Sequence, residues 1–353
     1  MTTTPPTIIR KPRKRLTVVL LTDERLLPAG DLADYSDKQR LLRKTEFDVK
    51  RAVETLGHQF IAVGLSNDLS TIRGAIDAHK PDIVFNLAED FDGIGHFDQH
   101  VVSFLELLRQ PYTGCNPRGL TIARDKALTK KILAYDGLKV PEFAIFPMKR
   151  VTKRPSELGF PLFVKSLTEE GSVGISGASI VYDDVRLMER VDYIHRTAGT
   201  AAVAEQFIEG REIYVGIMGN ERATILPPWE FFVENRKEGA PLIATGRGKW
   251  DPEYQDQAGV MTGPAEISEK LAAKLEKLSR EIYRLLSLSG YARLDFRVTP
   301  SEDVYLIEAN PNPQIASDED FASSAEYAGI QYPELIERLI RFGMNYNPER
   351  MIL

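Results

Sequence analysis

The stretch that decides the fold is Tyr291–Asn310, YARLDFRVTPSEDVYLIEAN. Two strand-like runs separated by a polar turn predict an antiparallel hairpin. A four-residue turn places Asp295 opposite Glu308 and Arg293 opposite Asn310. Side chains alternate along a strand, so these four polar residues are expected on one face. The other face is expected to be apolar core and is formed by Leu294, Phe296, Val298, Tyr305, Ile307 and Ala309.

The opposed carboxylates of Asp295 and Glu308 raise an electrostatic question. Two like charges directly across a strand pair destabilise a hairpin, so a cation between them is one interpretation. Oxygen ligands in a small set suit Mg²⁺ or Mn²⁺, which complete their shells with water and substrate phosphates. The alternative is an acidic hairpin face that is simply solvated.

A second feature lies upstream, where the apolar run Phe160–Val164 ends in Lys165. The loop that follows, 169–174, contains Gly171 and Ser172. A buried ammonium needs an anion, and glycine-bearing loops can turn N–H groups toward phosphate oxygens, so the pair favours phosphate binding. The pattern is not the P-loop, and a lysine that snorkels to solvent is the alternative.

A third feature is Glu205-Gln206-Phe207-Ile208, followed by Gly210 and Glu212. It is consistent with a strand that carries a carboxylate at each end. Such a pair suits an amino group and a pair of sugar hydroxyls, both of which donate hydrogen bonds.

Outward from these motifs, the length of 353 residues predicts two or three domains. Apolar runs, among them strands expected over residues 60–65 and 82–87, alternate with helical patterns over residues 16–118, which predicts a parallel sheet. Residues 119–204 are expected to form a central unit with a helix over residues 121–135 and a strand over residues 175–181. Residues 205–345 are expected to form a C-terminal unit with a strand over residues 213–218. Apolar residues recur every three or four positions from Ile267 to Leu285, which predicts an amphipathic helix. The long polar segment 229–262 lacks periodicity and is interpreted as a lid loop.

Composition and charge argue against a nucleic-acid-binding, membrane-spanning or secreted protein. The net charge is −6, which gives no field for gathering nucleic acid or anionic lipid. No apolar run is long enough to cross a bilayer and no secretory leader is recognised, so a cytosolic location is expected. Residues 1–15 form a basic tail, interpreted as loose and solvated, with a nucleic-acid arm as the alternative. The one cysteine, Cys115, cannot form an internal disulfide and is expected to be buried.

The order of these motifs resembles the ATP-grasp superfamily, most closely the D-alanine–D-alanine ligases. Further points of likeness are Pro111-Tyr112-Thr113-Gly114, the Asp125-Lys126 pair and Pro264-Ala265-Glu266-Ile267 before the long helix. The resemblance covers roughly residues 80 to 340. It implies three α/β subdomains with ATP between the central and C-terminal sheets.

The resemblance also implies roles for individual residues. Lys126 and Lys165 would contact the nucleotide phosphates, Glu205 the adenine amino group and Glu212 the ribose hydroxyls. Arg293 would stabilise the tetrahedral oxyanion, and with Lys165 it would be catalytic. The remaining nucleotide-binding positions would be Gly171, Ser172, Phe207, Ile208 and Lys249, and the magnesium ligands Asp295, Glu308 and Asn310.

The implied activity is an ADP-forming ligase that joins a carboxylate to an amine through an acyl phosphate. The amino-acid pocket departs from the family pattern: Leu21-Thr22-Asp23-Glu24 replaces a glycine-rich start, and Ala88-Glu89 replaces a His-Gly pair. Amino-acid or small-peptide substrates other than two D-alanines are therefore expected. Two alternatives stay open, a D-alanine–D-alanine ligase with a divergent pocket and a nucleotide-binding regulatory protein without turnover. Candidate substrate residues are Glu89, His96, Trp250, Asn312 and Gln314.

His96 and His100 have the spacing of a zinc pair on a helix. No glutamate follows His96, as the zinc peptidase pattern requires. A position in the substrate pocket, a plain helix start and a zinc site are the three interpretations. The family also suggests a homodimer, for which the sequence offers no interface.

Overall fold

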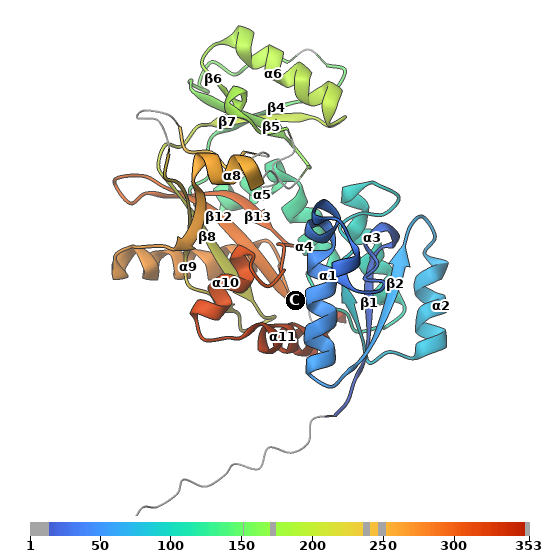
Figure 1. The fold of residues 1–353 in the computed structure, drawn as a ribbon. Helices are drawn as coiled ribbons and strands as arrows, with labels where there is room; N and C mark the ends of the chain where they lie inside the picture. Colours follow the sequence, from blue (N-terminus) through green and yellow to red (C-terminus); the bar gives the residue numbers. More distant parts are fainter. Residues whose placement is uncertain (1–13, 151, 170–173, 236–240, 246–251, 350–353) are drawn as a thin grey trace, which may run out of the picture.

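The computed structural model describes residues 14–150, 152–169, 174–235, 241–245 and 252–349. Three sheets, each with its own helices, make up this part of the chain (Figure 1). The α/β architecture expected from the sequence is confirmed. Gly171, Ser172, Lys249 and Trp250 lie outside the described residues.

The N-terminal sheet is parallel, with strand order β2-β1-β3, as the alternation of apolar runs predicts. Helix α11, near the C-terminus, packs against α1 and β3 and shares their core, although the sequence places it with the C-terminal unit. The elements of this region are β1 (Thr17–Asp23), α1 (Asp37–Thr55), β2 (Gln59–Leu65), α2 (Ser70–His79), β3 (Ile83–Asn86), α3 (Asp98–Leu107) and α11 (Tyr332–Asn345).

The central sheet is antiparallel, with strand order β4-β7-β5-β6, and α6 packs on it. In Figure 1 this unit forms the green layer above the rest of the molecule. The strand expected over residues 175–181 is reduced to a two-residue β6, because residues 177–179 form a 3-10 turn. The elements are β4 (Phe143–Phe146), β5 (Leu162–Ser166), β6 (Ile180–Val181), α6 (Asp184–Thr197) and β7 (Ala202–Gln206).

The C-terminal sheet has strand order β11-β10-β8-β12-β13, with β9 paired to β8. The predicted amphipathic helix is present as α9. The segment 229–262, expected to be a lid loop, is not a loop throughout, because it contains β10 and most of β11, which pair antiparallel. The sequence pattern missed these strands because cross-strand pairing leaves no helical periodicity. The elements are β8 (Arg211–Met218), β9 (Thr224–Ile225), β10 (Trp229–Val233), α8 (Pro252–Ala258), β11 (Val260–Pro264), α9 (Glu269–Leu285), β12 (Tyr291–Val298), β13 (Val304–Asn310) and α10 (Asp320–Tyr327).

Two short helices connect the N-terminal and central sheets. The sequence predicts one helix over residues 121–135, but the structure divides it into α4 (Pro117–Arg124) and α5 (Lys126–Tyr135). The break falls at Asp125, whose backbone is extended and whose carboxylate accepts hydrogen bonds from the Ala127 and Leu128 amides. A capping residue of this kind starts a new helix.

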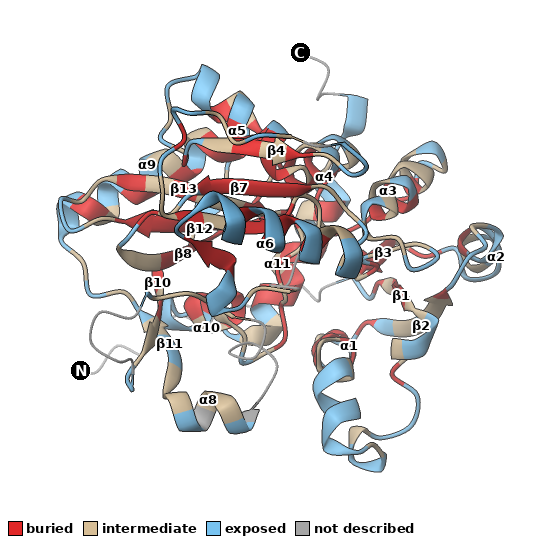
Figure 2. Cartoon of the chain, turned by 90° about the horizontal axis from the view of Figure 1, so that it is seen from above, coloured by how far each residue is buried: buried red, intermediate tan, exposed pale blue. Residues whose placement is uncertain are grey.

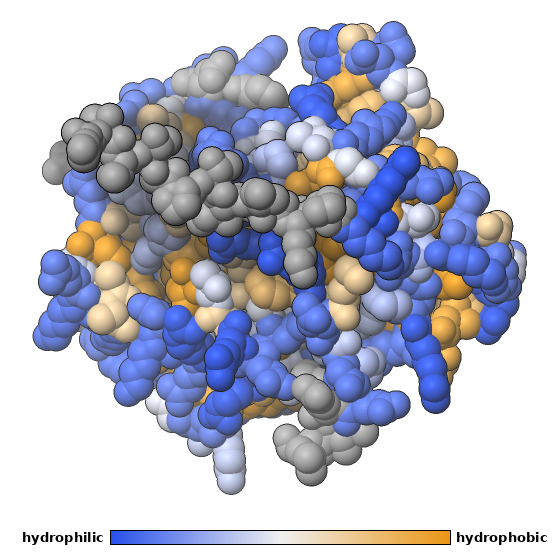
Figure 3. Space-filling view, turned by 90° about the horizontal axis from the view of Figure 1, so that it is seen from below, coloured by the Kyte–Doolittle hydropathy of each residue, from blue (hydrophilic) through white to orange (hydrophobic). Residues whose placement is uncertain are grey.

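Buried residues gather in the strands, including β1 and β3 of the N-terminal sheet. Figure 2 shows strands of the central and C-terminal sheets largely in red. The largest core joins the inner face of the C-terminal sheet to α4, α9 and the N-terminal domain. On the face drawn in Figure 3, hydrophilic side chains predominate and apolar ones gather in small patches, as is normal for protein surfaces. Among the described residues, no helix is long and apolar enough to cross a membrane.

Candidate active site

The hairpin of β12 and β13 places its polar residues as the sequence predicts. Asp295 pairs with Glu308, and Arg293 pairs with Asn310. The connecting loop, residues 299–303, is one residue longer than expected, which shifts the register near the turn. A β-bulge at Asp295/Phe296 takes up one residue of β13 and shifts the register back. The predicted pairing is therefore correct at the site because two local departures cancel.

Because of the longer loop and the bulge, the core face of β13 differs from the predicted one between the turn and Asp295. Tyr305 and Ile307 were expected there, but Val304 and Leu306 are the buried residues that face Val298 and Phe296. Between the bulge and the turn, each side chain of β13 points to the face opposite the one expected, because the pairing slips by one. Ile307 instead lines a cleft beside Glu308.

The two opposed carboxylates are compensated by cations of the chain itself. Arg293 Nε and Nη2 donate to the two oxygens of Asp295 at 2.8 and 2.9 Å. Lys126 Nζ lies 3.1 Å from Glu308 Oε1. Burial lowers the pKa of Arg293, but the Asp295 charge outweighs this effect and raises it overall. The repulsion inferred from the sequence is thus relieved within the protein, without requiring an ion.

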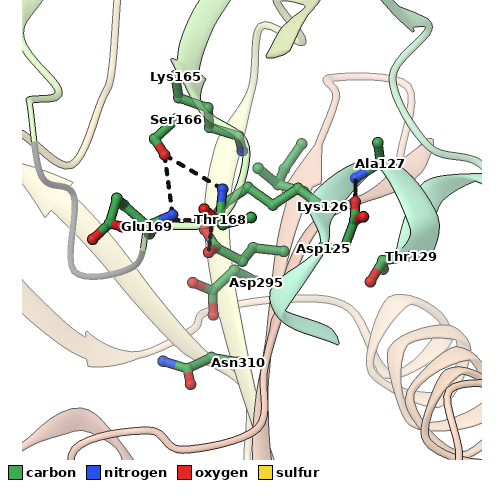
Figure 4. A network of polar contacts seen from close by, with 12 residues as sticks. Asp125, Lys126, Ala127, Thr129, Lys165, Ser166, Thr168, Glu169, Asp295 and Asn310 are labelled. Carbon is green, nitrogen blue, oxygen red and sulfur yellow. Dashed lines mark hydrogen bonds and ion pairs between the residues drawn. The ribbon is translucent and has the colours of Figure 1, made fainter. Parts of the chain in front are cut away.

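Asp295, Glu308 and Asn310 nevertheless fit a magnesium ion chemically. All three present oxygen atoms from one face of the hairpin, and Figure 4 shows Asp295 and Asn310 close together below Lys126. Asn310 Oδ1 accepts a bond from the Asn312 amide and retains a second lone pair. Oxygen donors of this kind are those that Mg²⁺ and Mn²⁺ prefer.

Lys126 is the first residue of α5, and its side chain reaches the start of the loop that the sequence predicts to bind phosphate. Its Nζ donates to the Glu169 carbonyl at 2.6 Å, just before the loop residues that are not described. Ser166 Oγ accepts hydrogen bonds from the Thr168 and Glu169 amides and so turns the chain after β5 (Figure 4). The α5 terminus and the start of the loop are therefore held together.

Glu205 lies between two buried lysines. Lys165 Nζ is 2.8 Å from Glu205 Oε1, and Lys130 Nζ is 3.0 Å from Oε2. Burial alone would raise the pKa of Glu205, but the charges of Lys130 and Lys165 lower it below its usual value. Each carboxylate oxygen of Glu205 is therefore paired with a lysine ammonium.

Lys130 was not identified from the sequence. Its side chain is 2% exposed, and its Nζ also donates to the Ile307 carbonyl at 3.1 Å, within the bulged part of β13. The available signal was its spacing, because Lys130 lies four residues after Lys126 and therefore on the same side of α5.

One cleft lies between the central and C-terminal sheets. Its described lining does not include Lys126, Lys130, Arg293 or Asn310. Phe163 and Phe207 stack with ring centroids 6.5 Å apart on one wall. Glu212 accepts hydrogen bonds from Arg297 at 2.7 Å and from the Tyr214 hydroxyl at 2.8 Å. The described lining of the cleft thus combines an apolar wall that suits a flat ring, a lysine that suits phosphates and carboxylates that suit a metal. Its described lining includes the predicted residues Lys165, Glu205, Phe207, Ile208, Glu212, Asp295 and Glu308.

A second cavity contains three of the predicted substrate residues, Glu89, Asn312 and Gln314. His96 does not line it and instead contacts the Phe97 ring edge to face, with centroids 4.9 Å apart. Among the described residues, no group of three or more His, Cys, Asp or Glu could hold a metal, and His96 and His100 are therefore not part of such a group.

A buried ion pair connects the loops of this cavity. Arg124 Nε donates to Asp98 Oδ2 at 2.8 Å, and Arg124 Nη2 donates to the Glu89 carbonyl at 3.0 Å. The Asn312 side chain donates to the same Asp98 oxygen at 3.3 Å. The pair thus positions Glu89 after β3 and Asn312 after β13.

Comparison with known proteins identifies the family of the chain. Residues 132–341, more than half of the chain, match the family described as "D-ala D-ala ligase C-terminus". The chain belongs to the D-alanine–D-alanine ligase family. Members of this ATP-grasp family are ATP-dependent, ADP-forming ligases that make C–N bonds, and the enzyme class expected from the sequence is confirmed.

Individual relatives extend the comparison. The chain is 32% identical over 83% of its length to the uncharacterized protein y4sG of Sinorhizobium fredii, 85% of which is covered. It is also 32% identical over 70% of its length to the D-alanine–D-alanine ligase of Pelotomaculum thermopropionicum, 76% of which is covered.

Solved structures share the fold of this family member. The ATP complex of the Bacillus anthracis D-alanine–D-alanine ligase matches with a TM-score of 0.72 at 22% identity, covering 93% of this chain and 97% of that one. The VanG D-Ala:D-Ser ligase of Enterococcus faecalis matches with a TM-score of 0.69 at 17% identity, covering 94% and 100%.

Proposed function

We propose that this ligase couples ATP hydrolysis to amide-bond formation between an amino acid or small peptide and an amine other than a second D-alanine. The observation that carries the proposal is the short segment of chain that links the two cavities. Glu308 lines the cleft, and Asn312, four residues later, lines the second cavity. This proximity supports transfer of a phosphoryl group from a nucleotide in the cleft to a carboxylate bound in the second cavity.

The reaction proceeds in two balanced steps. A substrate carboxylate oxygen attacks the γ-phosphorus of ATP, which forms an acyl phosphate and releases ADP. The amine nitrogen then attacks the acyl carbon, an amide bond forms, and phosphate leaves while the nitrogen loses its proton. An ionised carboxylate is a poor electrophile, and its phosphorylation supplies the leaving group.

The chain's own residues have separate parts in this chemistry. Lys126 and Lys165 offset phosphate charge, while Glu205 and Glu212 bind the base and the ribose. Arg293 stabilises the oxyanion. Preorganised charges of this kind are the main protein contribution to phosphoryl and acyl transfer. Asp295, Glu308 and Asn310 would hold Mg²⁺, with Mn²⁺ as a substitute, and the ion would supply further charge neutralisation at the phosphates.

The substrate preference rests on the altered pocket. The family's glycine-rich start is replaced by Leu21-Thr22-Asp23-Glu24, and its His-Gly pair by Ala88-Glu89. The second candidate is a D-alanine–D-alanine ligase, which the name of the relative from Pelotomaculum thermopropionicum favours. A cytosolic location, a homodimer, the subdomain boundaries and roles for Gly171, Ser172, Lys249, Trp250 and Gln314 remain predictions.

The test is ADP and phosphate release with Mg²⁺-ATP over a panel of paired D- and L-amino acids and dipeptides. We expect at least one pair other than two D-alanines to raise ADP release well above background. Efficient dipeptide synthesis from D-alanine alone would establish the second candidate instead.

Arg293→Ala provides the mechanistic control. Removing one oxyanion donor costs about 10²- to 10³-fold in kcat in other enzymes, and a loss of this order is expected here. Tight ATP binding without turnover on any pair, unchanged in Arg293→Ala, would contradict the proposal and indicate a regulatory nucleotide-binding protein.

A further inference from the structure

The second cavity has a wall that the family resemblance does not account for. Its volume is about 460 Å³, and it is enclosed by the end of β1, one face of α1, the end of β3 and the loop after β13. Helix α1 contributes Leu41, Leu42, Arg43 and Glu46 to this wall.

Glu46 is the unusual member of the wall because it is only 4% exposed. Its Oε1 accepts a hydrogen bond from the Thr22 hydroxyl at 2.8 Å, which orients the carboxylate. Its Oε2 is fully buried and has no hydrogen-bond partner. Burial raises the pKa of Glu46, as expected for a carboxylate without a bound cation. An unsatisfied buried oxygen of this kind is costly unless a ligand pairs with it.

The neighbouring arginines make their hydrogen bonds with other groups. Arg25 forms a bidentate pair with Asp23. Arg43 stacks over the Tyr35 ring, with its Cζ 4.8 Å from the centroid, and donates to the Arg25 carbonyl at 2.5 Å. Arg43 Nε is buried without a hydrogen-bond partner, and Arg43 acts on Glu46 only through space. Glu46 Oε2 therefore accepts no hydrogen bond from either arginine and can accept one from a cationic group that enters the cavity.

We propose that Glu46 binds the ammonium group of the amino acid that supplies the carboxylate, and that this amino acid has an apolar side chain larger than a methyl group. The inference rests on the proposed ligase function. An amine held as an ammonium ion by a carboxylate has no free electron pair, so it cannot be the attacking amine. The ammonium at Glu46 must therefore belong to the carboxylate donor.

The apolar preference follows from the neighbouring side chains. Leu26, Leu41 and Leu42 line the same cavity, and Ala88 and Ile315 add further apolar surface. Apolar surface of this kind favours a ligand that can exclude water from it. The cavity volume also leaves room beyond that needed for alanine.

The experiment compares wild type with Glu46→Gln, which keeps the shape and removes the charge. ADP release is measured with leucine, valine, phenylalanine and alanine of both configurations as carboxylate donors. The N-acetyl form of each is the charge-free probe. Glu54→Gln is the matched control, because Glu54 lies on the same helix and is exposed. Melting temperatures without ligand establish that the variants fold.

We expect Glu46→Gln to raise KM for the best donor about tenfold or more, with KM for ATP changed less than twofold. The wild type should use N-acetyl donors poorly, and Glu46→Gln should use them equally poorly. Leucine or phenylalanine should be a better donor than alanine. An unchanged donor KM in Glu46→Gln, or equal use of free and N-acetyl donors by wild type, would overturn the inference.

A binding measurement separates this inference from the ligase proposal. If wild type releases no ADP with any donor, the ligase proposal fails and thermal shifts decide the role of Glu46. Free leucine or phenylalanine should then stabilise wild type but not Glu46→Gln, and equal or absent shifts would overturn the inference. Thr22→Val, which removes the orienting hydroxyl, should weaken donor binding in the same direction if Glu46→Gln does not fold.

Discussion

At the residue scale, Lys130 contacts two parts of the nucleotide cleft at once. It forms an ion pair with Glu205 on β7 and donates to the Ile307 carbonyl on β13. Burial lowers the pKa of Lys130, and the charge of Glu205 opposes this effect. Lys130 is therefore a positioning residue for the carboxylate proposed to bind the adenine amino group.

We predict that Lys130→Met weakens ATP binding but leaves inosine triphosphate binding almost unchanged. Glu205 would lose one of the two lysines that orient it. Glu205 is proposed to accept a hydrogen bond from the adenine amino group, which ATP has and inosine triphosphate lacks. KM for ATP should rise about tenfold, as for a lost hydrogen bond to a charged group, and the preference for ATP should fall accordingly. Lys131→Met, at the exposed neighbour, should leave both values unchanged. Equal losses for the two nucleotides would indicate a structural role only.

A second prediction at this scale concerns the metal carboxylates. Glu308→Gln should abolish turnover and should also remove the extra thermal stabilisation that Mg²⁺ adds to a non-hydrolysable ATP analogue. Asp295→Asn should do the same and lower the ligand-free melting temperature further, because it leaves the buried Arg293 without its bidentate partner. The measurement is thermal unfolding with the analogue plus Mg²⁺ or plus EDTA. Undiminished Mg²⁺ stabilisation in both variants would exclude these carboxylates as ligands.

At the element scale, periodic patterns predicted the elements well. Helix α9 begins and ends close to the predicted range, and so do β2, β3 and β8. The break between α4 and α5 was not predicted, because apolar residues continue through both helices and the cap at Asp125 is a local hydrogen-bond feature. The sequence also failed to predict that Val304 and Leu306, and not Tyr305 and Ile307, face the core. The reason is related, because a β-bulge leaves no trace in an alternating pattern of apolar and polar residues.

The cap at Asp125 provides the prediction for this scale. Asp125→Ala should destabilise the protein by about 1 kcal/mol, because the Ala127 and Leu128 amides lose their acceptor. It should also raise KM for ATP, since Lys126 is the next residue. Asp125→Asn keeps an oxygen acceptor and should restore most of the stability. Asp136→Ala, at the other end of α5, is the control and should have little effect on KM in steady-state assays.

At the scale of the whole molecule, the family resemblance carried by the order of the motifs predicted the α/β fold class. The sequence could not predict which distant side chains meet. Asp98, Arg124 and Asn312 are brought together from three segments, and the approach of α11 to α1 joins the two ends of the chain. Such contacts depend on tertiary packing and leave no local pattern.

The buried pair of Asp98 and Arg124 should stabilise this assembly measurably. Arg124→Met leaves the Asp98 carboxylate buried without its cation, which costs about 3–5 kcal/mol in comparable cases. The double variant Asp98→Asn, Arg124→Met should recover part of the loss, because the two residues act as a unit. Denaturant unfolding of the four proteins gives the coupling. Additive losses would mean that the pair does not act together, and Lys139→Met, in an exposed pair, should change stability little.

The hairpin that carries the metal face has a consequence for engineering. The loop 299–303 and the bulge at Asp295/Phe296 shift the strand register in opposite directions, so changing either one alone would misalign the strands. A designer who shortens the tip by one residue without straightening β13 would rotate Glu308 out of line with Asp295. Chimaeras between relatives should therefore exchange the two features as one inherited unit.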